Sequence, residues 1–157
     1  MRENAFSSII RKDLANFCKH YEIPIHLNLI VDAPRSKKKP YDFYMVAKKF
    51  IAIELKVEGG LSIRKDKVVP HQIYNLTEVV KTGHSSAYII VLFEREKKVA
   101  IVSPEKWIEI FSNIIKKSIK VNKFLERAEF LDCYIIDRVK MPFGTAWDWR
   151  TFWHELA

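Results

Sequence analysis

The sequence predicts an α/β domain in which helices flank a central mixed β-sheet. Apolar residues recur at helical spacing near the start of the chain and again after Pro70. Between these stretches, short apolar or alternating segments have the period of strands. Residues 41–46 and 50–57 are joined by only three residues, too few for a crossover, so we expect an antiparallel hairpin rather than a doubly wound sheet.

The composition is that of one folded domain with a strong positive charge. The chain has 157 residues, of which 48% are hydrophobic, so we expect a single domain over residues 1–157 that ends in a tryptophan-rich segment, 144–157. With 27 Lys and Arg against 19 Asp and Glu, the formal net charge is +8. This charge favours nucleic acid as partner, although solvated lysines alone also explain it.

Cysteine use and hydropathy indicate the compartment. Cys18 and Cys133 each lie within an apolar run, which predicts two buried thiols in a reducing environment rather than a disulfide. The longest apolar runs are shorter than the roughly 18 residues needed to span a bilayer. We therefore expect a cytoplasmic protein with no membrane partner.

The first half of the chain predicts one helix and up to three strands. An amphipathic helix is expected over residues 3–23, limited by Pro24. Residues 25–31 alternate weakly and are a possible strand, and residues 32–40 form a basic loop. The hairpin of residues 41–46 and 50–57 follows.

The second half continues with a basic connection over residues 58–69 and a helix from Pro70 that stops at Gly83. Residues 87–93 and 97–103 predict paired strands, and a further helix runs from Pro104 through Ile115. Residues 130–136 are a possible last strand. For the tail, two interpretations stand: a helix over its own sheet, or docking on a partner subunit through the side chains Trp149, Trp153 and Leu156.

Three polar residues interrupt the apolar hairpin. In the second strand, period two places Glu54 and Lys56 together on the face opposite the aliphatic side chains, and the hairpin can bring Asp42 close to Glu54. Neighbouring carboxylates repel each other unless a cation lies between them, which favours Mg²⁺, with the Leu55 carbonyl as a further ligand. The alternative is a solvated edge of mixed charge.

An acid followed on the next strand by acid-x-Lys resembles the PD-(D/E)XK nuclease superfamily, which has a restriction-endonuclease-like core. The stretch "SIRKDKVVPHQIYNL" resembles RecU-type Holliday-junction resolvases, and Glu3, "SKKKPYD" and "IELK" are similar to the archaeal Hjc-type enzymes. The resemblance implies a homodimeric endonuclease, of a phage or a prokaryotic cell, that cuts four-way DNA junctions with Mg²⁺ or Mn²⁺. It implies these site residues: Asp42 and Glu54 as metal ligands, Lys56 as catalytic lysine, and Gln72 orienting water or lysine.

Several assignments depend on context. Glu3 is either a further metal ligand from the first helix or a carboxylate favoured by the helix dipole. The residues expected to hold DNA phosphates lie on both sides of the motif: Arg35, Lys37, Lys38, Lys39, Arg64, Lys65, Lys67 and His71. Ser36 lies farther from Asp42 than the corresponding serine of the archaeal enzymes. Two alternative functions remain: a related nuclease acting on linear or flapped DNA, and a non-catalytic basic DNA-binding module.

Overall fold

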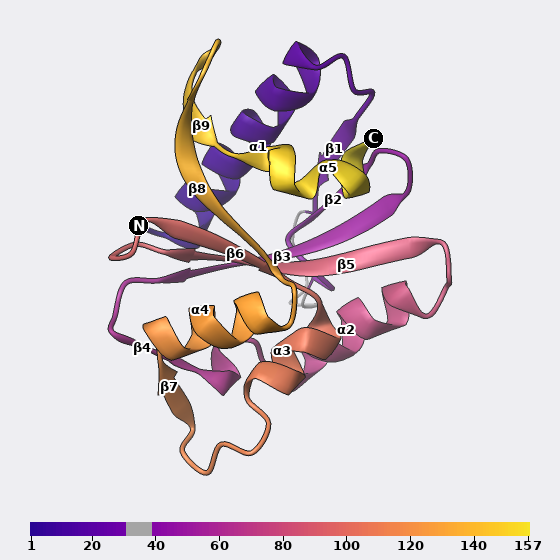
Figure 1. Cartoon of the computed structure of the whole chain (residues 1–157). Helices are drawn as coiled ribbons and strands as arrows, with labels where there is room; N and C mark the ends of the chain where they lie inside the picture. The colour runs from indigo at the N-terminus through magenta and orange to yellow at the C-terminus, as the bar shows by residue number, and fades with distance from the viewer. Residues whose placement is uncertain (31–38) are drawn as a thin grey trace.

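The computed structural model describes residues 1–30 and 39–157, and its helices lie on both faces of a central sheet (Figure 1). Among the described residues, the strands of this sheet follow the order β1-β2-β3-β5-β6-β8-β9. Their bounds are β1 His26–Leu29, β2 Phe43–Val46, β3 Phe50–Glu58, β5 Ser85–Phe93, β6 Lys98–Val102, β8 Tyr134–Met141 and β9 Gly144–Trp147. The predicted mixed sheet flanked by helices is confirmed.

The topology of the sheet follows from the lengths of its connections. The predicted hairpin is present, with β2 antiparallel to β3 and Val46 opposite Phe50. β3 and β5 are parallel, and helix α2 (Pro70–Val80) lies in the long connection that this pairing requires. The remaining neighbours in the sheet pair antiparallel.

One face of the sheet is covered by the two ends of the chain. Helix α1 (Glu3–His20) packs there beside the 3₁₀ segment η2 (Trp149–Phe152) and the short helix α5 (Trp153–Leu156). Its apolar stripe meets the aliphatic side chains of β3, and these residues are almost fully buried: Phe6, Ile10, Leu14, Phe17, Ile51, Ile53, Leu55 and Val57. The period-two prediction for β3 is therefore confirmed on this face.

The opposite face carries a second apolar core. It is covered by α2, α3 (Pro104–Ile110) and α4 (Val121–Phe130), together with a small sheet formed by β4 (Ser62–Arg64) and β7 (Ser118–Lys120). The 3₁₀ segment η1 (Lys65–Lys67) joins β4 to the approach of α2. Trp107 and Phe124 lie at the centre of this core, with ring centroids 5.5 Å apart. β3 is thus buried on both faces, so Glu54 and Lys56 are not on a solvated edge.

Several predicted boundaries were wrong. The helix that begins at Pro104 ends at Ile110 instead of continuing through Ile115, and Asn113 just beyond it has φ of 60°, which a helix does not accommodate. Helix α4 and strands β4, β7 and β9 were not predicted. The last predicted strand begins at Tyr134 rather than at residue 130, because α4 extends through Phe130. Helix α1 ends at His20, and Glu22 then has φ of 56°.

The tail packs over its own sheet, the first of its two interpretations. Trp149 and Leu156 are at most 1% exposed, within the core that also holds α1, whereas Trp153 remains 37% exposed. Glu155 adds a polar attachment, because its carboxylate accepts a hydrogen bond from the Tyr88 hydroxyl at 2.7 Å and lies 2.6 Å from the Lys49 ammonium. Trp149 and Leu156 are therefore not available to a partner subunit.

Two smaller predictions concern the thiols and the membrane. Cys18 and Cys133 are both free, and burial raises the pKa of each thiol to about 11, so neither is an activated nucleophile. No helix in the described part of the chain has the length and apolar character needed to cross a bilayer.

Candidate active site

The site forms where β2 separates from β3. Their ladder ends at the pair Phe43 and Ile53, and the Asp42 amide still donates to the Ile53 carbonyl at 2.9 Å. Two residues further along β3, the Leu55 amide donates to the Asp42 carboxylate at 2.7 Å instead of to a backbone carbonyl of β2. A side chain thus takes the place of a backbone acceptor, and the edge of β3 is open at this point.

The open edge also orients the Leu55 carbonyl. In a strand, the N–H and C=O groups of one residue point to the same side. Because the Leu55 amide faces Asp42, the Leu55 carbonyl faces the same side of β3. This direction agrees with its predicted use as a metal ligand.

Glu54 and Lys56 lie in the middle of β3 on the face covered by α2. They are only 4% and 8% exposed, and the Lys56 ammonium is 3.3 Å from the Glu54 carboxylate. A buried ion pair is retained only when further hydrogen bonds satisfy its remaining polar groups. Here the additional hydrogen bond comes from Gln72, whose side-chain nitrogen donates to Glu54 at 2.7 Å.

Gln72 is held in this orientation by the start of its own helix. Its side-chain oxygen accepts the Val69 amide at 3.1 Å, which occupies the oxygen and turns the amide nitrogen toward Glu54. This is the reciprocal half of a capping box, and Pro70 in the first turn favours helix initiation directly after Val69. The predicted residue Gln72 therefore hydrogen-bonds to Glu54, on the same carboxylate oxygen that the Lys56 ammonium approaches.

The predicted residues share one cavity. It has a volume of about 220 Å³, and segments from both faces of the sheet contribute to its lining: Glu3, Asn4, Ser7, Leu29, Lys39, Asp42, Glu54, Lys56 and Gln72. Five of these were predicted from the sequence as catalytic or metal-binding residues: Glu3, Asp42, Glu54, Lys56 and Gln72. The structure brings all five to one place, and their chemical roles stay predictions.

The electrostatics of the cavity favour a cation. Burial raises the pKa of Glu54 to about 7, and the negative charges of Asp42 and Glu3 add to this effect, whereas Lys56 opposes it. The Lys39 ammonium lies 2.9 Å from the Asp42 carboxylate. Three carboxylates thus face two ammonium groups in this cavity, and its burial opposes the negative charge of Glu54.

The ligand set fits a hard divalent ion better than zinc. Among residues 1–30 and 39–157, no three His, Cys, Asp or Glu side chains are close enough together to hold a metal. Structural and catalytic zinc sites use three or four such ligands. Mg²⁺ is commonly held by one or two carboxylates and keeps several waters, which Asp42, Glu54 and the Leu55 carbonyl can satisfy. Glu3 faces the same cavity from the exposed start of α1.

The predicted DNA-binding residues are only partly gathered at the site. Arg35, Lys37 and Lys38 lie outside the described residues, as does Ser36. Lys39 lines the cavity itself, and His71 lies in the first turn of α2.

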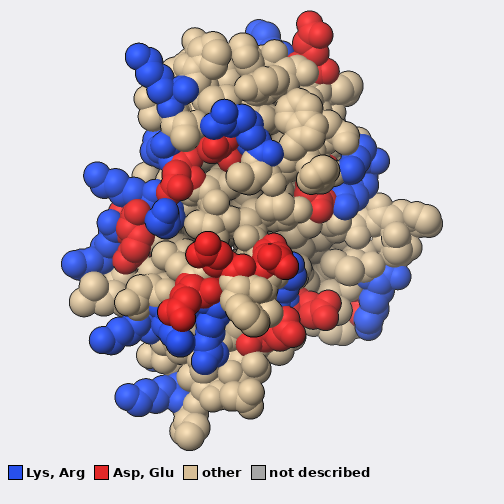
Figure 2. All heavy atoms as spheres, in the orientation of Figure 1, with Lys and Arg blue, Asp and Glu red and all other residues tan. Residues whose placement is uncertain are grey.

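Two of the predicted DNA-binding residues, Arg64 at the end of β4 and Lys67 in η1, are paired with carboxylates. Arg64 is bound by Asp66 at 2.8 Å, and Lys67 lies 3.7 Å from Glu58. On the face shown in Figure 2, basic side chains form several separate groups with acidic side chains between them. Phosphate contacts by Arg64 and Lys67 would therefore compete with internal carboxylates.

Sequence reasoning missed part of the lining. Ser7 is buried and lies one helical turn after Glu3, so the same helical stripe could have identified it. Leu29 and Asn4 carry no comparable signal. Lys39 was predicted as a phosphate contact, and its pairing with Asp42 depends on a fold around the open strand edge that the sequence pattern does not specify.

The likeness of this chain to known proteins lies in its fold. No protein-family profile matches it, and no curated protein matches its sequence. Among solved structures, the fold is similar to that of Hjc from Archaeoglobus fulgidus, a Holliday junction resolvase from an archaeal hyperthermophile. The identity is 12% and the TM-score 0.47, and the match covers 74% of this chain and 92% of that chain.

Replacement of Gln72 is expected to raise the pKa of Glu54 further. The Gln72→Ala change removes a hydrogen bond to the charged carboxylate, and such a bond contributes about 1.5 kcal/mol, or about one pKa unit. The measurement is a pH titration of the carboxyl carbons by NMR with a chelator present. Asn122→Ala, in the exposed part of α4, is the matched amide control. An unchanged or lower Glu54 pKa would show that Gln72 does not stabilise the charged form.

Proposed function

We propose that this chain is a metal-dependent endonuclease that hydrolyses phosphodiester bonds in DNA four-way junctions. The observation that carries the proposal is the buried pair of Glu54 and Lys56, which opens with Asp42 into one cavity. Desolvating two charges in an otherwise apolar strand costs several kcal/mol, and hydrophobic replacements of such pairs are often neutral or stabilising. A purely structural role for the pair therefore does not account for its position.

The residues of the cavity have separate roles in the proposed reaction. Asp42, Glu54 and the Leu55 carbonyl would hold Mg²⁺ or Mn²⁺, and Gln72 would keep Glu54 in place. A bound divalent ion supplies Lewis-acid polarisation of the phosphate and lowers the pKa of a bound water. Lys56 would donate a hydrogen bond to the attacking water or to a phosphate oxygen, and its ammonium would stabilise the negative charge that develops there.

The substrate class rests on charge and on resemblance. A net charge of +8 attracts polyanions without regard to sequence, as recognition of DNA shape requires. The choice of four-way junctions rests on the resemblance of residues 62–76 and of the "IELK" motif to junction resolvases. Symmetric cleavage of such a junction calls for a two-fold enzyme, so the proposal includes a homodimer.

A comparison of substrates tests this proposal. With Mg²⁺ or Mn²⁺ at one fixed salt concentration, we expect cleavage of a synthetic four-way junction at least about tenfold faster than cleavage of linear or flapped duplexes, a difference of about 1.4 kcal/mol in transition-state binding. The measurement is the initial rate on end-labelled substrates, with a chelator as control. Equal rates on all three substrates would favour the general nuclease. Binding without cleavage under either metal would favour the non-catalytic module.

A further inference from the structure

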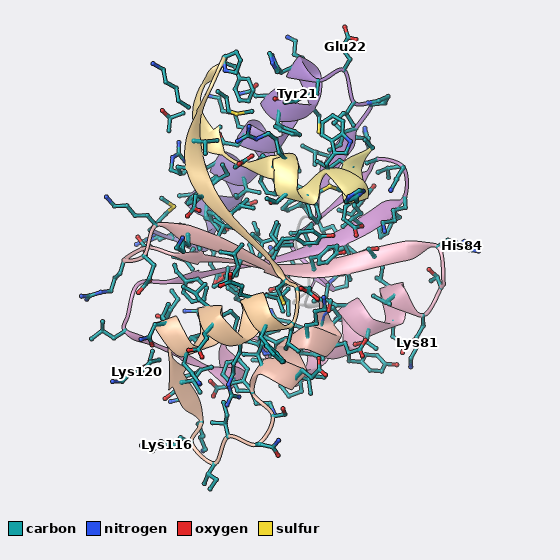
Figure 3. The ribbon with its side chains drawn as sticks, in the orientation of Figure 1. Tyr21, Glu22, Lys81, His84, Lys116 and Lys120 are labelled. Carbon is teal, nitrogen blue, oxygen red and sulfur yellow. The ribbon has the colours of Figure 1, made fainter. Side chains whose placement is uncertain are left out.

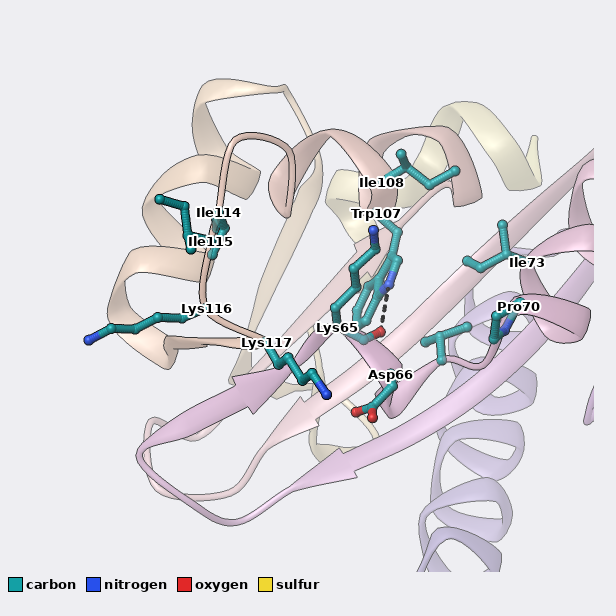
Figure 4. A pocket seen from close by; sticks show the side chains of 11 residues that line it. Lys65, Asp66, Pro70, Ile73, Trp107, Ile108, Ile114, Ile115, Lys116 and Lys117 are labelled. Atoms are coloured by element: carbon teal, nitrogen blue, oxygen red, sulfur yellow. Dashed lines mark hydrogen bonds between the residues drawn. The ribbon is translucent and has the colours of Figure 1, made fainter.

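Another cavity among the described residues is larger than the candidate active site. It is a groove of about 580 Å³ between η1, the first turn of α2, helix α3 and the loop of residues 111–117 (Figure 4). Most of its walls are apolar side chains: Val68, Pro70, Ile73, Trp107, Ile108, Ile114 and Ile115. None of its lining residues also lines the candidate active site.

The apolar walls include aliphatic side chains that the fold leaves in water. Ile115 is fully exposed and Ile108 is 49% exposed, on opposite sides of the groove. Removing apolar surface from water is favourable, so contact of both side chains with a partner would be favourable. Exposed apolar surface beside a groove is typical of an interaction site.

The rim of the groove is basic. Lys65, Lys116 and Lys117 line it, and in the part of the chain that the structure describes none of their ammonium groups is within 4.0 Å of a carboxylate. The acidic lining residue, Asp66, is held by two hydrogen bonds from Arg64, at 2.8 and 3.0 Å. Figure 3 shows Lys116 pointing outward at the lower end of the molecule. The rim therefore presents a positive field above an apolar floor.

We propose that this groove binds an acidic peptide segment of a partner protein. An apolar side chain of the peptide enters between Ile73, Ile108 and Ile115, and neighbouring carboxylates lie beside the three lysines. This pairing satisfies both features of the groove, since carboxylates complement the rim and an aliphatic or aromatic anchor fills the floor. The proposal does not depend on the nuclease function.

The nature of the walls argues against nucleic acid as the occupant. Sites for unpaired bases use exposed aromatic faces for stacking. The single aromatic residue of this groove, Trp107, is 1% exposed, and its indole N–H donates to the Lys65 carbonyl at 3.3 Å. Its ring therefore packs beneath the groove in the core with Phe111 and Phe124. The apolar side chains left open to a ligand are therefore aliphatic.

Fluorescence anisotropy tests the proposal with a labelled synthetic peptide, a run of aspartates followed by leucine and phenylalanine. We expect binding that weakens about tenfold or more in two variants, Ile108→Ser combined with Ile115→Ser, and Lys116→Glu combined with Lys117→Glu. Val80→Ser and Lys19→Glu are matched exposed controls, and neither should change the affinity. All substituted side chains are exposed, and circular dichroism verifies the fold of each variant.

Two control ligands decide what the groove recognises. A peptide of aspartates alone should bind much more weakly than the anchored peptide. Equal binding of the two, binding that is indifferent to the isoleucine changes, or no binding at all would overturn the proposal. The second control ligand is a single-stranded oligothymidylate. If the oligothymidylate binds the unmodified protein and loses affinity in the two groove variants, while the peptide does not lose affinity, the occupant is nucleic acid instead.

Discussion

Asp42→Asn and Lys56→Met are each expected to lower metal-dependent cleavage of a four-way junction by about 10³-fold or more. Asparagine keeps the shape of Asp42 and can still accept the Leu55 amide, so the open edge of β3 should persist while the charge is lost. Methionine keeps the length of Lys56 in its buried site but removes the ammonium group. The measurement is the single-turnover rate with Mg²⁺, with binding of the junction measured separately in a chelator.

Matched controls separate the effect of these changes in the cavity from the effect of the same change in net charge elsewhere on the protein. Asp137→Asn and Lys98→Met make the same changes in an exposed ion pair between β6 and β8, outside the residues that line the cavity. Both controls should cleave at the rate of the unmodified protein. Normal cleavage by Asp42→Asn or Lys56→Met would show that the reaction does not take place in this cavity.

Glu54→Gln is expected to stabilise the metal-free protein at pH 8 while it abolishes cleavage. The folded carboxyl has a pKa of about 7 against an ordinary value of 4.5, so the folded state holds its proton more tightly than the unfolded state. The stability from this difference is fully present below pH 4.5 and is lost as the pH rises to about 7. A shift of this size corresponds to about 3 kcal/mol, which sets the upper limit of the gain from an uncharged side chain.

The free energy of unfolding in urea measures this effect. Glu54→Gln should be about 1–3 kcal/mol more stable than the unmodified protein at pH 8, and nearly equal to it at pH 4, where the stability linked to the Glu54 proton is fully present. Added Mg²⁺ should stabilise the unmodified protein and leave the variant unchanged. Glu126→Gln, an exposed change on α4, is the control. A loss of stability at pH 8 would mean that the Glu54 charge supports the fold instead of opposing it.

The parts of the structure that were predictable depend on local patterns. The hairpin of β2 and β3 follows from alternation and a short connection, and α2 follows from Pro70 and its apolar stripe. Glu54 and Lys56 were recognisable because they interrupt an apolar strand. Their environment was less predictable: the sequence suggested a polar edge as the alternative, whereas α2 covers them and Gln72 completes the hydrogen bonding.

The parts that were missed depend on contacts between distant segments. The helix from Pro104 ends early because residues 111–117 turn back toward η1, where the Lys65 amide donates to the Lys117 carbonyl. This contact forms β4 and β7 into a sheet and creates the groove, and neither partner carries a signal of it alone. β9 is similar, since the Trp147 amide donates to Asp13 of α1 from the far end of the chain.

The candidate site takes its side chains from helices that lie on opposite sides of the sheet. Glu3 belongs to α1 and Gln72 to α2, and each helix is fixed by its own separate core, through Phe6 on one side and Leu76 on the other. The two cores on opposite faces of the sheet therefore hold different walls of one cavity in place. A packing defect in either core would therefore disturb one side of the cavity, the Glu3 side or the Gln72 side, and leave the other in place.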